Sequence, residues 1–578
     1  MSRLRIPVLL LLFAAAAAME ALRLTSLSTL TNRDIWLHLE TGLWILQHHA
    51  LPHNGIFSQS GDLPWSACSW AYDVLLAAAY RLLDLRAIPL LLMLSKAALA
   101  FVTFLLAGGL SDGLAPARVN TESQPHTEGK FWLAIFLSIV AQYILGAVPV
   151  GPGYCSVLLF AVELLLLIEF RRSGNFHLLY WLPALFLLWA NLDVQFVYGI
   201  GLLLLFVTAN YFAEWRPEEG KAPLPAVSRK TALGVVALSL LATLLTPYFY
   251  RPWTVFFSTA TSAANRYFGD FHAMSFHQPQ DYLLLLLTMS AFLALGRRRS
   301  RDLFSIGLLI ACAALSFHSQ RDVWLVTLAA LAVVSTRYPV AGSQTLTAKD
   351  GARTEIPGSL ASENRVLRRE PTKNQRSKSR FPQGLKPASL MAFGGTAEAV
   401  PFPNSFMRLL LGTGYWVLAL AIVVAVMAAL IPREKMRAKL AGTYPVAAAD
   451  AVRSQQLPQP IFNSYEFGGF LIWYLRDYPV AIDGRADLYG PDFMIQYSKA
   501  MNADIPYSAY PAMSQARTLL LARNSIMADA LAGLPAFKVV YRDNVAVVLE
   551  KQDSSQFPVL SSQEDQGLQK DWKVATKP

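Results

Sequence analysis

Long apolar runs, separated by short polar or basic blocks, constrain the fold of this chain more than any other feature. The chain is 54% hydrophobic and only 15% charged, with a mean hydropathy of +0.36. A soluble domain does not need so much apolar surface, so most of the chain is expected in lipid. We predict a polytopic α-helical membrane protein with about eleven transmembrane helices and a small soluble α/β domain at the C-terminal end.

The apolar runs give the expected positions of the spans. Residues 7–22 follow a basic N-terminus, and we interpret them as a retained anchor in preference to a cleaved signal peptide, because further spans follow. Residues 75–83 are amphipathic and too short to cross, so they are expected along the membrane surface. The other spans are predicted at residues 87–110, 131–150, 154–170, 176–190, 196–212, 231–248, 281–296, 303–317, 323–336 and 409–431.

Basic blocks at the ends of these spans predict the orientation. If the N-terminus is cytoplasmic, the basic residues at 171–172, 216–230 and 297–301 all fall on the cytoplasmic side, as the positive-inside rule requires. A further basic block at 433–439 falls on the outer face. We base the predicted orientation on the three blocks that agree. The net charge of +11 comes from such blocks, so it does not predict nucleic-acid binding.

The C-terminal part of the chain differs in composition from the spans. Residues 338–408 are rich in Ser, Pro and basic side chains and are predicted to be a disordered cytoplasmic insert, either a plain linker or a segment attracted to anionic lipid. Residues 441–552 are expected to form an extracytoplasmic α/β domain with a partly parallel sheet, followed by a disordered tail at 553–578. Its strands are predicted at 460–463, 480–482, 518–522, 537–542 and 545–550, and its helices at 465–475, 492–501 and 525–534.

Polar and titratable side chains concentrate in the external loop at residues 23–86. Residues 32–72 read NRDIWLHLETGLWILQHHALPHNGIFSQSGDLPWSACSWAY. Asp34 and His38 are four residues apart and share one face if this segment is helical. Two interpretations remain open: an interfacial helix with its tryptophans at headgroup level, or a functional site.

Two other groups of side chains are candidates for a metal site and a sugar site. His48, His49 and His53 are not predicted to bind metal, because adjacent histidines on a helix cannot both face one ion. The segment from Asp483 to Asp487 (DGRAD) could bind a sugar at a strand end or form a turn in which Arg485 is held by its neighbouring carboxylates, and we favour the turn. The three cysteines have no disulfide or metal-site spacing.

Four stretches together resemble a known family: residues 32–65, LWANLDVQFVYGIGLLLL at 188–205, TPYFYRPW at 246–253, and FNSYEFGGFLIWYL…VAIDGRADLYG at 462–490. They are similar to bacterial multi-spanning proteins of the GT-C glycosyltransferase class, relatives of the dolichyl-phosphate-mannose protein mannosyltransferases, in a subgroup with a C-terminal α/β domain. The chain departs from that pattern where Asn32 and Ser69 replace carboxylates, Leu37 replaces Trp and Asp193 replaces His.

The resemblance implies a GT-C-like fold in the bacterial inner membrane and transfer of a sugar from a polyprenyl-phosphate donor to an extracytoplasmic acceptor. Asp34 is then the candidate base, or the ligand of a divalent metal that activates the acceptor. Arg33 and His38, helped by Arg266 and Arg321, are candidates for the donor phosphate. No cofactor is otherwise predicted, and the expected partners are membrane lipid and the lipid-linked sugar.

Two other functions are compatible with the sequence: a transporter or flippase of lipid-linked saccharide, and a non-catalytic scaffold whose α/β domain binds a partner. A transporter is expected to carry paired charges through the bilayer. The predicted spans hold few charges. We expect Lys96 and Glu163 to face one another or to share a polar cavity, the alternative being that Lys96 snorkels along its own helix. For a transferase, Asp34 is expected in a cavity walled by residues 250–280 and roofed by the C-terminal domain.

Overall fold

The computed structural model describes residues 30, 32–108, 124–146, 148, 151–215, 228–267, 271–335 and 431–552. The predicted anchor at 7–22, the insert at 338–408, the tail at 553–578 and the span at 409–431, apart from Ile431, lie outside these residues.

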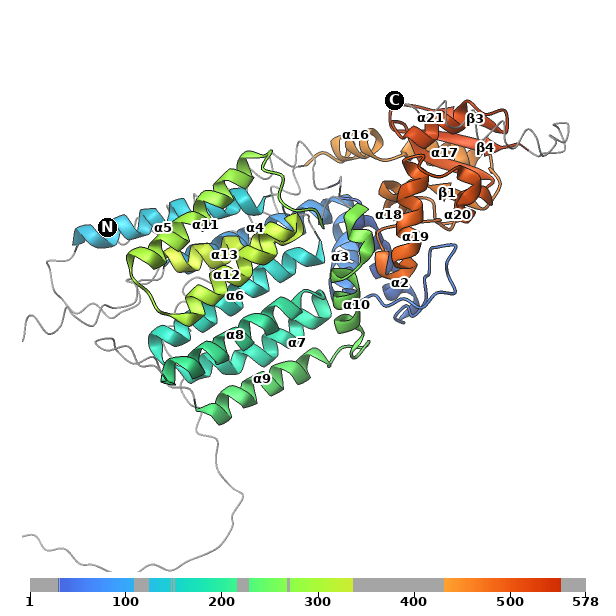
Figure 1. Ribbon diagram of the computed structural model, residues 1–578. Helices are drawn as coiled ribbons and strands as arrows, with labels where there is room; N and C mark the ends of the chain where they lie inside the picture. The colour runs from blue at the N-terminus through green and yellow to red at the C-terminus, as the bar shows by residue number, and fades with distance from the viewer. Residues whose placement is uncertain are drawn as a thin grey trace, which may run out of the picture. The chain divides into compact units, whose positions relative to one another are not determined.

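Most of the helices between residues 87 and 335 lie side by side in one bundle (Figure 1). Each span predicted in this part of the chain coincides with a helix, because an apolar run can satisfy its backbone hydrogen bonds in lipid only by coiling. The bundle helices are α4 (Ala87–Leu106), α5 (Gln124–Leu145), α6 (Pro152–Ser173), α7 (Leu182–Leu192), α8 (Phe196–Trp215), α9 (Arg229–Thr243), α11 (Pro279–Arg297), α12 (Leu303–His318) and α13 (Val323–Ser335).

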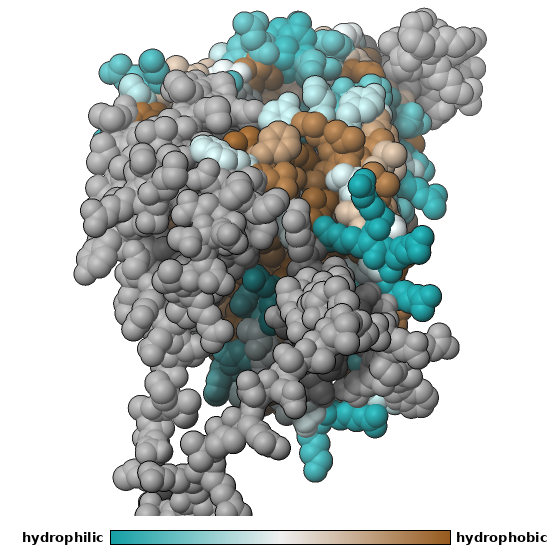
Figure 2. All heavy atoms as spheres, turned by 90° about the vertical axis from the view of Figure 1, so that its left-hand side faces the viewer, coloured by the Kyte–Doolittle hydropathy of each residue, from teal (hydrophilic) through white to brown (hydrophobic). Residues whose placement is uncertain are grey.

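Among the described residues, three helical stretches are long and apolar enough to cross a membrane: Trp70–Leu106, Pro152–Ser173 and Pro279–Arg297. Four further apolar helices are shorter. The first stretch is broken at Asp84 (φ 56°, ψ −147°), which divides α3 (Trp70–Leu83) from α4. Seen from one end of the bundle, brown apolar atoms gather between teal hydrophilic residues where the surface is not grey (Figure 2).

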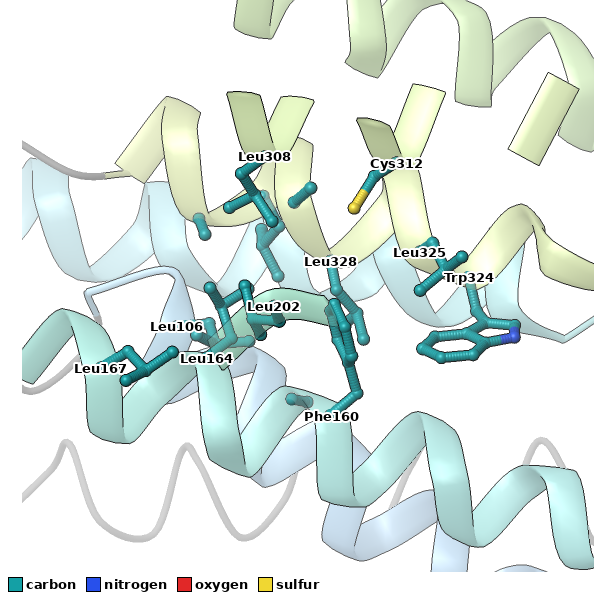
Figure 3. Packing of buried hydrophobic residues seen from close by; sticks show 14 of the residues in the cluster. Leu106, Phe160, Leu164, Leu167, Leu202, Leu308, Cys312, Trp324, Leu325 and Leu328 are labelled. Carbon is teal, nitrogen blue, oxygen red and sulfur yellow. The ribbon is translucent and has the colours of Figure 1, made fainter. Parts of the chain in front are cut away.

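The bundle encloses one buried apolar core. Side chains from different helices meet there, among them Phe160 and Leu164 of α6, Leu202 of α8 and Leu328 of α13 (Figure 3). Trp324 at the start of α13 packs edge-to-face on Phe160, with ring centroids 5.2 Å apart. Helix α13 is buried over nearly its whole length, so it is the central helix of the bundle.

The C-terminal domain is built on a four-stranded mixed sheet in the order β1–β2–β4–β3. Strand β1 (Ile461–Asn463) is parallel to β2 (Thr518–Ala522), and β4 (Ala546–Lys551) is antiparallel to both β2 and β3 (Phe537–Arg542). This confirms the partly parallel sheet. The helices are α16 (Arg433–Thr443), α17 (Val446–Ser454), α18 (Tyr465–Tyr474), α19 (Ala486–Met501), α20 (Pro511–Ser514) and α21 (Ile526–Ala532).

One predicted strand, at 480–482, is wrong. Val480 forms only a single bridge, to Ser58 of the first loop. The backbone N–H of Ala481 donates to the side-chain oxygen of Asn463 at 2.8 Å, and the Asn463 amide donates to the carbonyl of Ile482 at 2.8 Å. Because the Asn463 side chain takes these backbone groups, the segment has no ladder to join.

The first loop and the C-terminal domain are packed together. The loop contains α2 (Asp34–His48) and the start of α3, and α18 packs on α2 within one apolar cluster. The backbone of Gln59 donates to Val480 at 2.9 Å, and the backbone of Val480 donates to Phe57 at 3.0 Å. Arg476 also donates to the buried Glu40 at 2.5 Å. Residues more than 400 positions apart therefore build one structure.

Candidate functional site

A cavity of about 200 Å³ lies between α2, the start of α3 and the C-terminal domain. Val255 of α10 (Arg251–Ala260) contributes one wall, and Gly484, Arg485 and Asp487 contribute another. Residues 250–280 and the C-terminal domain, expected as the wall and the roof of a cavity at Asp34, therefore both contribute lining residues. The remaining lining residues are Asp34, Leu37, His38, Thr41, Trp65, Ser66, Ala67, Cys68, Ser69, Asp73 and Val194.

Helix α2 presents Asp34 and His38 to this cavity one turn apart. The side-chain oxygen of Asn32 accepts the Asp34 backbone N–H at 3.0 Å, which satisfies a donor that the first turn leaves free. The carboxylate of Asp34 also lies at the positive end of the helix dipole. Its side chain is 46% exposed, so it is open to a ligand.

Arg33 lies next to Asp34, outside the cavity lining. Its Nε is 4.0 Å from Asp34 Oδ1, and its guanidinium lies over the ring of Tyr465, 4.8 Å from the centroid. A cation at this position lowers the cost of placing negative charge at the mouth of the cavity. Arg33 is thus beside the predicted site but is held by the C-terminal domain as well as by Asp34.

Two glycines allow the C-terminal domain to close on α2. A β-carbon at Gly484 would lie 2.3 Å from Asp34 Oδ1, and one at Gly469 would lie 2.4 Å from the carbonyl oxygen of Arg33. Any larger residue would push the domain away from the start of α2. The glycines of the EFGGF and DGR segments therefore belong to the same contact as the NRD segment.

His38 is paired with a carboxylate that the sequence analysis did not single out. Its Nδ1 lies 2.7 Å from Oδ1 of Asp73 on α3, and the Asp73 side chain is 3% exposed. Burial lowers the pKa of His38, but the charges of Asp73, Asp34 and Asp193 outweigh it and raise the pKa above the ordinary value of 6.5. The imidazole is therefore stabilised as a cation beside the cavity.

Arg485 is fixed in the opposite wall. Its Nε and Nη2 donate to the two oxygens of Asp483 at 2.8 and 2.7 Å, and Nη1 donates to the carbonyl of Ile56 at 2.8 Å. Its guanidinium also lies 4.7 Å from the ring centroid of Trp65. Burial lowers the pKa of Arg485, but Asp483 outweighs burial and raises it. The predicted turn, with Arg485 held by a neighbouring carboxylate, is confirmed, and the same turn lines the cavity.

Asp487 and Cys68 complete the polar lining. Asp487 is accessible from the cavity but surrounded by protein, and this loss of bulk water raises its pKa to about 6. Burial raises the pKa of the Cys68 thiol to about 12, so this side chain stays protonated and is no nucleophile at neutral pH. Asp487 is the only one of the two that exchanges a proton near neutrality.

The other two predicted phosphate-binding residues do not line this cavity. Arg321 faces Gln195, whose amide oxygen accepts from Nη2 at 2.7 Å and from Nε at 3.0 Å when the amide is oriented toward the guanidinium. Arg266 lies in the short helix Ala263–Tyr267, where its carbonyl contacts the His272 ring at 2.9 Å. Of the predicted residues, the structure brings together Asp34, His38 and, at the edge, Arg33.

The predicted pairing of Lys96 with Glu163 by direct contact is wrong. Glu163 is fully buried in α6, and neither of its carboxyl oxygens has a hydrogen-bond partner among the described residues. It packs close to Gly199 and Trp189 instead, because a β-carbon at Gly199 would lie 2.6 Å from Glu163 and 2.5 Å from Trp189. Spacing along two helices did not reveal which faces meet.

Within the described ranges, no three His, Cys, Asp or Glu side chains are close enough to hold an ion together. His38 and Asp73 bond each other, and Asp34 lies against Gly484.

Comparison with known proteins gives structural similarity at low sequence identity. No protein-family model and no curated protein matches the chain. Among solved structures, the chain is similar to the crystal structure of ArnT from Cupriavidus metallidurans bound to undecaprenyl phosphate, with 14% identity and a TM-score of 0.42 over 94% of this chain and 98% of that one. We base the assignment of the site on this chain's own residues.

Sequence reasoning missed Asp73 as a site residue, and it favoured a turn over a sugar site for the segment that holds Gly484 and Asp487. Asp73 lies four residues after Ser69, where the family resemblance implies a carboxylate, and this spacing was a usable signal. Asp487 and Gly484 are more than 400 residues from Asp34, and only the packing of the C-terminal domain reveals that they share its cavity.

Proposed function

We propose that the chain is a membrane glycosyltransferase that transfers a sugar from a polyprenyl-phosphate donor to an acceptor hydroxyl, with Asp34 as the base. The observation that carries the proposal is the cavity itself. An accessible carboxylate, Asp34, and an imidazole stabilised as a cation, His38, lie one helical turn apart on its wall. Displacement at an anomeric carbon requires both charges, one for the acceptor proton and one for the departing phosphate.

The reaction uses these groups in a fixed order. The acceptor oxygen attacks the anomeric carbon while its proton passes to the Asp34 carboxylate. The bond from the anomeric carbon to the phosphate oxygen breaks, and its electron pair leaves with the polyprenyl phosphate. Arg33 and His38 offset the charge that develops on that phosphate. The cavity of about 200 Å³ is smaller than the roughly 300–1,000 Å³ of pockets for drug-sized ligands, which suits a single sugar unit.

The family resemblance supports the same reaction, because its motifs supply both sides of the cavity. The NRD segment provides Asp34, and the DGRAD segment provides Gly484, Arg485 and Asp487. Few charges occur in the described bundle helices, which favours a transferase over a transporter.

The test is release of polyprenyl phosphate from synthetic polyprenyl-phosphate sugars by the full-length protein in nanodiscs. We expect the wild type to release it, and Asp34→Asn to lower the rate at least about 100-fold with unchanged folding. The matched control is Asp62→Asn, because Asp62 is an exposed carboxylate in the same loop and does not line the cavity. Equal rates for Asp34→Asn and the control would refute the base assignment. Movement of the intact lipid-linked sugar across vesicles without release would favour the flippase.

A further inference from the structure

Helices α2 and α3 approach each other closely where His38 meets Asp73. A β-carbon at Gly42, one turn after His38, would lie 1.9 Å from the Asp73 carbonyl oxygen. No side chain fits in that space, so Gly42 is what allows the backbone of α3 to approach α2 at Asp73. The ring of Tyr72 packs edge-to-face on His38 at 5.7 Å, which fixes the imidazole from the side.

The hydrogen bond to Asp73 leaves one ring nitrogen for a ligand. His38 lines the cavity, and a protonated imidazole whose Nδ1 donates to Asp73 keeps one further donor, Nε2–H, for a ligand. Among the described residues, no other hydrogen bond to His38 is present. A His⁺ whose Nδ1 is bonded to a buried carboxylate presents an N–H donor at a fixed angle.

Several charged or titratable groups face this imidazole. Asp34 acts from its own helix, Asp73 and Tyr72 from α3, and Asp193 from the end of α7. Across the cavity, the lining adds the fixed cation of Arg485 together with Asp487 and Cys68. The carboxylates outweigh burial, so the imidazolium persists above the ordinary pKa of 6.5.

We infer that Asp73 is the positioning residue of a phosphate-binding dyad, in which it holds His38 protonated and aims its Nε2–H at the donor phosphate. The inference rests on the proposed function and assigns the phosphate, rather than the acceptor, to this side of the cavity. His38 keeps its proton and donates a hydrogen bond to the phosphate oxygen that receives the electron pair. The acceptor proton goes to Asp34, so each group carries one role.

The test measures binding of decaprenyl phosphate, which carries no sugar, to the full-length protein in nanodiscs between pH 5.5 and 9. Because a raised pKa means that the cation is lost only as pH rises through the higher value, we expect wild-type affinity to fall on the alkaline side. Asp73→Asn retains the hydrogen-bond acceptor but removes the charge. It should move this fall to lower pH and weaken binding at pH 7.5 about tenfold. Asp62→Asn should match the wild type.

Two further arms make the outcome decisive. The His38→Gln protein should bind decaprenyl phosphate weakly, and its affinity should not fall as pH rises. If Asp73→Asn does not fold, the His38→Gln protein alone tests the inference. Inorganic phosphate and phosphatidic acid, tested as competitors, separate a free phosphate from a lipid phosphate, and we expect the lipid to compete better. A folded Asp73→Asn or His38→Gln protein with the wild-type affinity and pH profile would overturn the inference. Phosphate binding through the dyad without any sugar release would overturn only the proposed function.

Discussion

The backbone of Gly484 lies directly against the carboxylate of Asp34: a β-carbon at residue 484 would be 2.3 Å from Asp34 Oδ1. The two residues are 450 positions apart in the chain and belong to the C-terminal domain and to the first turn of α2. The glycine therefore sets where the proposed base can lie. This contact also makes the C-terminal domain part of the site rather than an appended module.

Gly484→Ala should displace the Asp34 carboxylate and lower sugar transfer about 10- to 100-fold, because a misplacement of about 1 Å at the reacting group has effects of that size. Overpacking should cost about 1–3 kcal/mol of stability. The measurements are the rate of polyprenyl-phosphate release and the thermal midpoint. Gly442→Ala is the matched control, because a β-carbon there meets no atom within 4 Å. Full activity in Gly484→Ala would show that the position of Asp34 is not set by this contact.

Glu40 gives the protein a pH-dependent stability. Burial raises its pKa from 4.5 to about 7, although Arg476 lowers it. A carboxyl whose folded-state pKa is raised binds its proton more tightly in the folded state. Its contribution to the free energy of unfolding is therefore present at low pH and is lost as pH rises from about 4.5 to about 7. Glu40→Gln should therefore raise the thermal midpoint at pH 8 and leave it nearly unchanged at pH 4.5.

Arg476→Ala tests the other member of the ion pair with Glu40. It leaves the buried carboxylate without the 2.5 Å contact from Arg476 and should lower the thermal midpoint at pH 8 more than at pH 4.5. Combining the two substitutions should remove most of the pH dependence between these values. If Glu40→Gln lowers the midpoint at pH 8, the ion pair outweighs the cost of burying the charge.

Glu163→Met should stabilise the bundle. The carboxyl of Glu163 is fully buried, and it has no hydrogen-bond partner among the described residues, so it bears a desolvation cost that an apolar side chain of similar volume avoids. We expect a gain of about 1–3 kcal/mol in unfolding free energy. Glu163→Gln is the isosteric control and should change stability less. A loss of stability in Glu163→Met would mean that Glu163 has a partner beyond the described residues.

Arg485→Lys should destabilise the C-terminal domain despite keeping the charge. The guanidinium bonds both oxygens of Asp483 and the carbonyl of Ile56, and an ammonium group cannot reproduce this fork. The expected cost is about 2–4 kcal/mol, comparable to damage to a buried ion pair. Arg542→Lys is the control, because its side chain is exposed in the same domain. Equal unfolding midpoints for the two variants would show that the Arg485 fork contributes little.

The helical bundle was predictable because its signal is local. An apolar run must coil to satisfy its backbone in lipid, so the predicted runs at 87–110 and 303–317 became α4 and α12 nearly as expected. The same locality made β2 and the β3–β4 hairpin predictable from short apolar runs and from the turn at Asp543. The segment at 480–482 failed because the Asn463 side chain takes its backbone groups, and no local pattern encodes that competition.

The spacing of Asp34 and His38 is enough to place them on one helix face, because 3.6 residues per turn puts residues four apart about one turn apart. The other side chains that meet them depend on the packing of distant segments. Gly42 has no side chain, so α3 can approach α2 closely enough for Asp73 to contact His38. The close contact of Gly484 with Asp34 places Arg485 and Asp487, from the far end of the chain, at the cavity. The same reason explains the wrong Lys96–Glu163 pair: helix periodicity gives the faces of one helix, but the rotation of two helices against each other depends on the packing of the whole core.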